Sequence, residues 1–169
     1  RFRNKFDYPL KIHEYATQVI PTNLLLSKQI RSNKFNRYDL MVRYMAIESV
    51  FFENDVGCVL YDRMQVKRGN TPHADPMRIF KNLIYNMKSK GFDSHSPIIV
   101  DEHLNLVDGA HRLACALFFN INNVPIRVCK GSFDAFYGIE WFQDNEFSEI
   151  DIKLLDKKKK EIFFNHAIY

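Results

Sequence analysis

The hydrophobic residues of this chain recur at two spacings, one typical of helices and the other of buried strands. Apolar side chains at intervals of three and four residues predict a helix over 39–53 with Asp39 as its N-cap. The same spacing predicts a helix over 76–90, with Asp75 as N-cap and Gly91 at its end. The predicted buried face of this second helix consists of Ile79, Phe80, Leu83, Ile84 and Met87.

Short apolar runs between turn residues predict a small sheet. A first strand runs into Pro21, and three more are expected at 97–101, 104–109 and 121–130, with a helix over 110–120 before the last. This alternation predicts an α/β (mixed α+β) domain in which a small mixed sheet is flanked by helices.

Other segments carry weaker patterns. The stretch Ser27 to Arg37 is polar and basic, which indicates an exposed connection. The stretch 58–70 has ambiguous periodicity, so it is expected to be a strand or a short helix. Residues 133–169 are aromatic and then amphipathic, which predicts a C-terminal helical extension.

Composition sets limits on the kind of protein. With 169 residues, 46% apolar and 26% charged, the chain is long enough for one globular domain. Its net charge is +4, and the run Lys157 to Lys160 lies beside acidic residues, so we expect a solvated helix face and no nucleic-acid binding. No membrane-spanning run and no signal peptide are visible. Because the chain begins at Arg1 without methionine, we expect a piece of a longer protein.

The three cysteines, Cys58, Cys115 and Cys129, are an odd number without paired spacing. We therefore expect reduced thiols in a cytoplasmic protein, and neither a disulfide framework nor a zinc site.

The stretch LVDGAHRLACAL places several polar groups where a predicted strand meets a predicted helix. A helix N-terminus binds anions through its first amides, and Gly109 and Ala110 allow a ligand to approach that backbone closely. Arg112 offers a fork suited to phosphate, His111 a neutral donor or a proton carrier near pH 7, and Asp108 a base or a metal ligand. Phosphate or nucleotide binding is the favoured interpretation. The alternative is that Asp108 only caps the helix, while His111 and Arg112 lie on the surface.

The segment Ser96 to Val128 resembles the core of the ParB/sulfiredoxin-like superfamily, in which Asp-Gly-x-His-Arg opens a helix between a strand and a Val-Pro strand. The stretch VIPTNLL is similar to the first strand and turn of that superfamily. The resemblance implies a single domain over 1–169 with a core at 17–128. An insertion at about 38–70 and the extension at 133–169 elaborate the minimal fold.

Members of this superfamily differ at the residue before His-Arg. In sulfiredoxins that residue is the catalytic Cys, whereas this chain has Ala110, and Cys115 lies one turn further along on a face expected to be buried. Partition proteins carry a Gly-Glu-Arg-Arg box and a downstream helix-turn-helix, and neither is evident here. The Asp-Gly-x-His-Arg form looks most like the free-serine kinases of the superfamily.

The resemblance to these kinases implies that the loop holds nucleotide phosphates while a carboxylate activates a substrate hydroxyl. We therefore expect ATP or ADP and Mg²⁺ as ligands and a small hydroxylated metabolite or sugar as substrate. Asp108 is the expected base or metal partner, and His111, with the amides after Gly109 and Arg112, is expected at the phosphates. A second acid is expected at Glu48, with Glu53, Asp62 and Asp75 as alternatives, although Glu48 also fits a solvated helix edge.

Arg63 and Arg68, with Lys67 between them, form a basic strip that is the candidate site for an anionic substrate, or else plain surface. Two other functions stay open: a nucleotide-gated interaction or DNA-binding module that does not turn over, and an accessory domain of a larger biosynthetic enzyme. A second carboxylate near Asp108 would favour the enzyme, and a contiguous basic face would favour the DNA-binding module.

Overall fold

The computed structural model describes residues 17–31, 36–70, 75–132 and 137–168. These residues form helices around one four-stranded sheet, which confirms the mixed α+β class. The strands are β1 (Gln18–Pro21), β2 (Ile98–Val100), β3 (Leu106–Asp108) and β4 (Asn123–Val128). The helices are α1 (Thr22–Gln29), α2 (Asp39–Phe51), α3 (Val56–Lys67), α4 (Pro76–Lys90), α5 (Ala110–Phe118), α6 (Ile139–Asp144) and α7 (Glu149–Asn165).

The sheet has the strand order β1-β4-β2-β3, so β4 and β2 lie in its middle. These two strands run parallel, while β1 pairs with β4 and β3 pairs with β2 in antiparallel fashion. The central strands are the apolar ones, since Ile98, Val100, Val124 and Ile126 are fully buried. Short apolar runs bounded by turn residues are typical of buried strands, which is why the sequence located them correctly.

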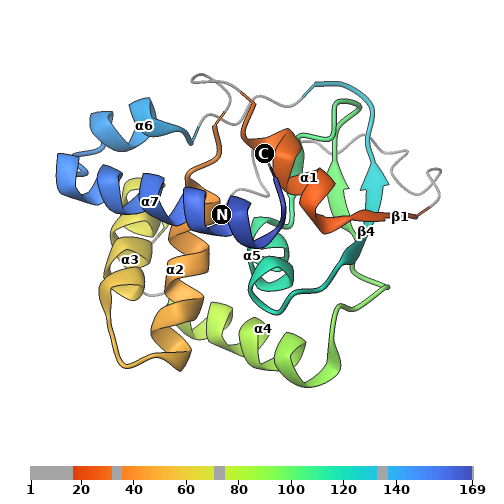
Figure 1. Ribbon diagram of the computed structural model, residues 1–169, viewed down its shortest axis with the longest axis horizontal. Coiled ribbons are helices and arrows are strands. Elements are labelled where there is room, and N and C mark those ends of the chain that lie inside the picture. The colour runs from red at the N-terminus through yellow and green to blue at the C-terminus, as the bar shows by residue number, and fades with distance from the viewer. Residues whose placement is uncertain (1–16, 32–35, 71–74, 133–136, 169) are drawn as a thin grey trace.

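Helices surround the sheet unevenly. Figure 1 shows α2, α3, α6 and α7 on one side of the molecule and the sheet with α1 on the other, with α5 between them. Helix α5 packs against α2 on one face and against β2 on the other, so its apolar residues Leu113, Ala114 and Leu117 are buried. This central position holds the N-terminus of α5 rigidly between the two halves of the core.

Helix α4 begins and ends where the sequence predicts. The Asp75 side chain accepts a hydrogen bond from the Arg78 amide, and Gly91 ends the helix with φ 75°. Three predicted core residues, Phe80, Ile84 and Met87, are buried. The prediction is wrong for Ile79, which is 57% exposed. Ile79 lies on the wall of a cavity described below, so the apolar face of α4 extends beyond the core.

The prediction that Asp39 caps its helix is wrong. Tyr38 occupies the N-cap position of α2, and Asp39 is the first residue of the helix. The Asp39 carboxylate is fully buried and forms ion pairs of 2.8 Å with both Arg37 and Arg43. Burial alone would raise the pKa of Asp39, but the two arginines outweigh it and hold that pKa well below its usual range.

The connection predicted at Ser27 to Arg37 is only partly exposed. Its first three residues belong to α1, residues 32–35 lie outside the described residues, and Asn36 and Arg37 are buried. Basic character suggested solvent exposure for Arg37, but a buried carboxylate compensates its charge.

The segment with ambiguous periodicity is a helix, α3. It lies very close to α2, because a Cβ atom at Gly57 would come within 1.9 Å of the Met45 carbonyl oxygen. Only glycine fits at this crossing. Helices α2 and α3 thus form one packed pair within the predicted insertion.

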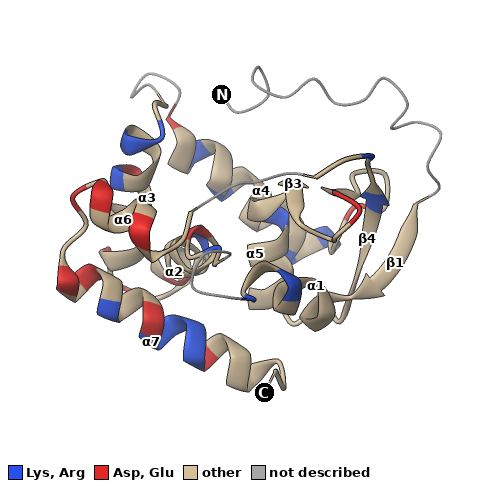
Figure 2. Ribbon diagram, turned by 90° about the horizontal axis from the view of Figure 1, so that it is seen from above, with Lys and Arg blue, Asp and Glu red and all other residues tan. Residues whose placement is uncertain are grey.

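The C-terminal extension is helical, as predicted. Ser148 and Asp151 form a reciprocal capping box at the start of α7, and Leu155 and Ile162 bury one side of the helix. The basic run is largely compensated, because Lys158 pairs with Glu48 and Glu161, and Lys159 and Lys160 pair with Asp156. Figure 2 shows basic and acidic residues alternating along α7.

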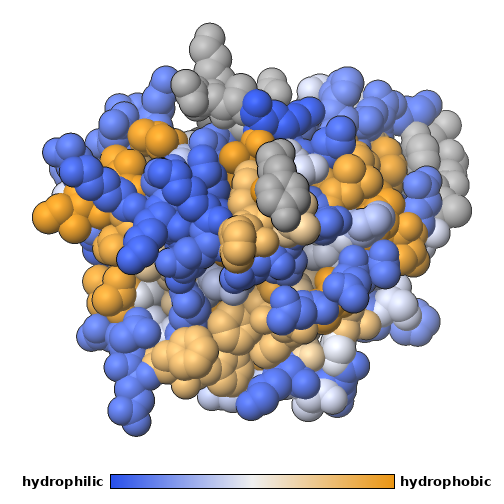
Figure 3. All heavy atoms as spheres, viewed as in Figure 1, coloured by the Kyte–Doolittle hydropathy of each residue, from blue (hydrophilic) through white to orange (hydrophobic). Residues whose placement is uncertain are grey.

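The surface is mixed in character. Figure 3 shows hydrophilic residues over much of one face, with smaller hydrophobic groups between them. Within the described ranges, no helix is long and apolar enough to cross a membrane.

Candidate functional site

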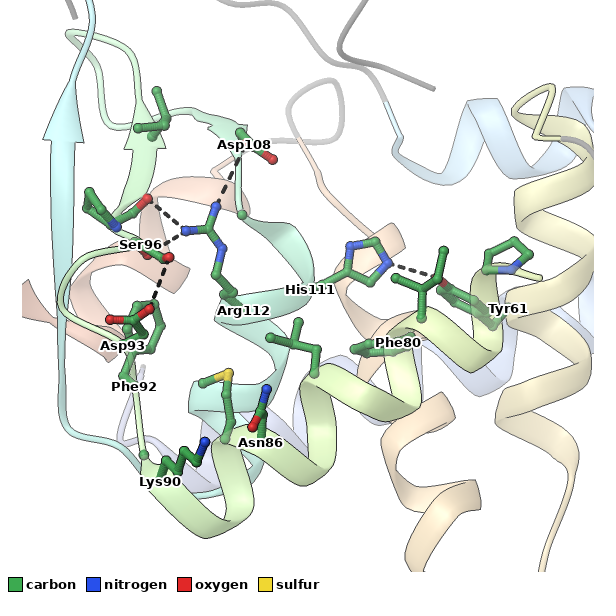
Figure 4. A pocket seen from close by; sticks show the side chains of 18 of the residues that line it. Tyr61, Phe80, Asn86, Lys90, Phe92, Asp93, Ser96, Asp108, His111 and Arg112 are labelled. Atoms are coloured by element: carbon green, nitrogen blue, oxygen red, sulfur yellow. Dashed lines mark hydrogen bonds and ion pairs between the residues drawn. The ribbon is translucent and has the colours of Figure 1, made fainter. Parts of the chain in front are cut away.

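A cavity of about 1640 Å³ opens at the turn between β3 and α5. Its walls come from α3, α4, the loop between α4 and β2, and the turn itself (Figure 4). One wall is apolar and follows α4, and the others carry polar side chains. Its polar lining residues include Tyr61, Gln65, Asn70, Asn86, Lys90, Asp93, Asp108, His111 and Arg112.

Gly109 is the residue that lets the chain turn sharply from β3 into α5. Its φ of 120° is one that residues with a side chain rarely adopt. A Cβ atom there would also lie 3.1 Å from the Ile98 side chain and from the Arg112 guanidinium. The backbone therefore requires glycine at position 109, whether or not a ligand binds there.

The N-terminus of α5 meets the cavity without a side-chain cap. Gly109 occupies the N-cap position, and no described side chain accepts a hydrogen bond from the first turn. Asp108 precedes this position and does not cap the helix, so the alternative prediction that Asp108 serves only as a helix cap is wrong. The amides of Ala110, His111 and Arg112 therefore begin a helix whose positive dipole end faces the cavity wall.

Arg112 points from α5 toward the entry of β2 (Figure 4). Its Nη1 donates hydrogen bonds to the carbonyl oxygens of Ser96 and Pro97, and its Nη2 lies 3.8 Å from the Asp108 carboxylate. These contacts fix the guanidinium plane beside the turn. They also tie the loop before β2 to the start of α5.

His111 points the opposite way, toward α3 (Figure 4). Its Nε2 lies 2.8 Å from the Tyr61 hydroxyl, and its ring meets the edge of Phe80 at a centroid distance of 4.7 Å. Burial, and then the positive charges of Arg43 and Arg68, lower the pKa of His111 well below its ordinary value. The environment thus favours a neutral hydrogen-bonding group over a proton carrier near pH 7.

Two carboxylates line the cavity, Asp108 and Asp93. Asp108 is partly exposed, whereas Asp93 accepts hydrogen bonds from the His95 amide and the Ser96 hydroxyl. Mg²⁺ in nucleotide sites is usually held by one or two carboxylates together with phosphate oxygens, and these are the carboxylates of the cavity wall that could contribute. In the described part of the chain no cluster of three or more His, Cys, Asp or Glu could hold a metal by itself.

Several residues that the sequence assigned to the site lie elsewhere. Glu48 pairs with Lys158 of α7 at 2.9 Å and does not line the cavity. Arg63 pairs with Asp151, and its guanidinium lies over the Phe147 ring. The Arg68 guanidinium lies over the Tyr137 ring and does not line the cavity. Its positive charge nevertheless contributes to lowering the pKa of His111. The two arginines of the basic strip thus contact other parts of the protein, and neither lines the cavity.

Other lining residues were missed by sequence reasoning. Tyr61 and Gln65 lie on α3, whose helical nature was ambiguous, so no pattern pointed them toward His111. Lys90 lies in the last turn of α4, and Asp93 follows that helix, but neither residue belongs to a motif in the sequence. The helical spacing that identified α4 could have indicated that Lys90 follows Leu83 and Met87 along the same side of that helix.

Cys115 is fully buried on the inner face of α5. Burial raises the pKa of its thiol to about 12. Such a thiol is neither accessible nor ionised near neutral pH, which agrees with the expectation that Cys115 does not replace a sulfiredoxin cysteine.

Comparisons with known proteins add no further constraint. No protein-family model matches the chain, and no curated protein and no solved structure matches it.

Proposed function

We propose that this protein is a nucleotide-binding phosphotransferase that moves the terminal phosphoryl group of ATP to a hydroxyl of a small metabolite or sugar. We also propose that it is a member of the ParB/sulfiredoxin-like superfamily, most similar to its free-serine kinases. The observation that carries the proposal is the cavity at the β3–α5 turn, where an uncapped helix N-terminus, an arginine and two carboxylates meet.

Phosphate groups are proposed to bind at the start of α5. The amides of the first turn and the positive end of the helix dipole attract an anion, and Arg112 adds a fixed guanidinium on the same side. Lys90 supplies a further cation on the wall of the cavity. Since several charges must be balanced around a triphosphate, this grouping supports nucleotide binding better than a lone helix end does.

The apolar wall suits a nucleobase. Ile79, Leu83 and Met87 of α4 and Phe92 after it line the cavity beside its polar end. Ligand sites typically combine such an apolar wall with a few polar groups, in volumes of about 300–1,000 Å³. The cavity here exceeds that range, so it has room for a nucleotide and a second small molecule together.

In the proposed reaction, Asp108 accepts the proton of the substrate hydroxyl. The hydroxyl oxygen then forms a bond to the terminal phosphorus of ATP, the bond from that phosphorus to the bridging oxygen breaks, and ADP leaves. When bound, Mg²⁺ would neutralise phosphate charge, and Asp93 is the carboxylate that would hold it while Asp108 acts as the base. Arg112 orients the phosphates throughout.

A cytoplasmic location belongs to the same proposal. ATP-dependent metabolic enzymes work where ATP is abundant, and the three cysteines are unpaired thiols, as expected for a reducing compartment. The proposed partners are the nucleotide and a small-molecule substrate, with no role for nucleic acid.

The test is a transfer assay with radiolabelled ATP and Mg²⁺ against pooled sugars and amino-acid alcohols. Wild type is expected to phosphorylate at least one pool, and Asp108→Asn is expected to lose about 100-fold or more of that rate. Asp144→Asn, an exposed carboxylate on α6, is the matched control. If wild type binds ATP but neither transfers nor hydrolyses it, the protein is instead a nucleotide-gated binding module.

A further inference from the structure

A chain of hydrogen bonds runs along the cavity wall from the end of α3 to the start of α5. Asn70 donates through its side-chain amide to the side-chain oxygen of Gln65, and a side-chain hydrogen bond from Gln65 lowers the pKa of Tyr61. Tyr61 reaches Nε2 of His111 at 2.8 Å. All four residues line the cavity, so a row of hydrogen-bonded side chains follows its wall and ends at the turn between β3 and α5.

Which group donates and which accepts in each of these hydrogen bonds follows from the chemistry of the side chains. Gln65 donates from its amide nitrogen to the Tyr61 oxygen, because its hydrogen bond lowers the pKa of Tyr61, which is the effect of a donor on a phenolic oxygen. The charged groups that act on the Tyr61 hydroxyl are Arg43, Arg68 and Asp62. The two guanidinium groups donate but never accept, and Asp62 acts on Tyr61 through its charge, with no hydrogen bond between the two side chains in the described structure. The acceptor for the Tyr61 hydroxyl hydrogen is therefore His111 Nε2.

His111 consequently carries no hydrogen on Nε2. Its ring is neutral near pH 7, because burial and the surrounding cations disfavour the charged form, so the single ring proton lies on Nδ1. Nδ1 has no hydrogen-bond partner among the described residues, and the side chain is only half-buried on the cavity wall. The charged groups that act on this ring are Arg43 and Asp39 of α2, Arg68 after α3, and Arg112 of α5 itself.

We infer that Tyr61 is a positioning residue that holds His111 as a neutral Nδ1–H donor for a phosphate oxygen. His111 is the second residue of α5, so its side chain leaves the backbone within the uncapped first turn. A neutral imidazole keeps its donor as pH changes, and it places no additional cation next to Arg43 and Arg68. The inference rests on the proposed function, since it names how the same turn recognises phosphate.

Nitrogen NMR of the ligand-free protein tests the first half of the inference. The His111 ring signals, assigned by their loss in His111→Gln, are expected to show the Nδ1–H form with no titration between pH 8 and pH 6. In Tyr61→Phe the ring is expected to lose its tautomer preference, while Tyr85→Phe, an exposed tyrosine on α4, leaves it unchanged. An Nε2–H ring in wild type, or a charged ring at pH 7, would overturn the inference.

Titration with pyrophosphate and with ADP tests the second half. Tyr61→Phe is expected to bind each probe about three- to tenfold more weakly than wild type, the range of one hydrogen bond, and Tyr85→Phe is expected to bind as wild type does. Equal affinity in Tyr61→Phe would overturn the inference and leave the proposed function standing. If wild type binds neither probe, the proposed function fails, whatever the tautomer of His111.

Discussion

Two helices of this protein begin beside an aspartate that is followed four residues later by an arginine, and the two pairs behave differently. Asp39 and Arg43 lie 2.8 Å apart, with side chains 0% and 2% exposed. Asp108 and Arg112 lie 3.8 Å apart, with side chains 36% and 19% exposed. The same spacing thus produces a buried structural ion pair at α2 and a partly exposed pair on a cavity wall at α5.

The difference lies in what else each pair contacts. A second arginine, Arg37, shares the Asp39 carboxylate, so this group is fully committed to holding the start of α2 in the core. Arg112 instead donates hydrogen bonds to the backbone carbonyl oxygens of Ser96 and Pro97, and the Asp108 carboxylate lies 3.8 Å from its Nη2. Removing one partner from a buried, compensated group of charges destabilises a fold, whereas a partly exposed pair on a cavity wall can contribute to ligand binding.

Removing the Asp39 charge should produce the largest loss of stability. Asp39→Asn leaves Arg37 and Arg43 buried without a countercharge, which is expected to lower the free energy of unfolding by about 3–5 kcal/mol. Urea denaturation at pH 7 measures this loss. A decrease below about 1 kcal/mol would show that the buried cluster is not structural.

The same cluster should appear in the pH dependence of stability. The pKa of Asp39 is lowered in the folded protein, so its contribution is present above the unfolded value near 4 and is lost as the pH falls below it. Wild type should therefore lose stability on acidification below about pH 4 more steeply than Asp39→Asn. Parallel curves for the two proteins would contradict this account.

Asp108→Asn should change stability little and activity strongly. Because the Asp108–Arg112 pair is long and partly exposed, its loss should change the free energy of unfolding by at most about 1 kcal/mol. The proposed transfer reaction should fall about 100-fold, since the variant lacks the base. A variant that unfolds early but keeps its specific activity would make Asp108 a structural residue like Asp39.

The buried side of α5 should give the smallest effect. Cys115→Ala removes one sulfur from a fully buried position, which is expected to cost about 1 kcal/mol of stability and to leave phosphate binding and transfer unchanged. Thermal melting and the transfer assay measure the two outcomes. An inactive variant that melts normally would reveal a thiol chemistry that its burial argues against.

The sequence predicted the central strands, α4 and α5 because their patterns are local. Apolar runs mark β2 and β4, and a cap, a proline and a terminal glycine mark α4. The sequence also located the turn at Gly109, where a left-handed backbone and close packing both require glycine. Apart from the packing of Gly109 against Ile98, these features depend on neighbours within a few residues.

Long-range pairing is what the sequence did not reveal. Nothing near Asp39 indicates that Arg37 turns inward, and nothing near His111 indicates that Tyr61, fifty positions earlier, meets its ring. Glu48 was an equally plausible acid by composition, but the packing of α7 against α2 gives it Lys158 as a partner. Which charges face a cavity is decided by tertiary packing, so the spacing of Asp and Arg alone could not distinguish the two pairs.

The most direct test of the central claim is calorimetric titration of ATP into wild type and Arg112→Ala. We expect wild type to bind ATP and Arg112→Ala to lose about 1.5–3 kcal/mol of binding free energy, as for one charge-assisted contact. Arg78→Ala, an exposed arginine at the start of α4, should bind as wild type does. Wild type without measurable affinity for ATP, or a folded Arg112→Ala with unchanged affinity, would contradict the account.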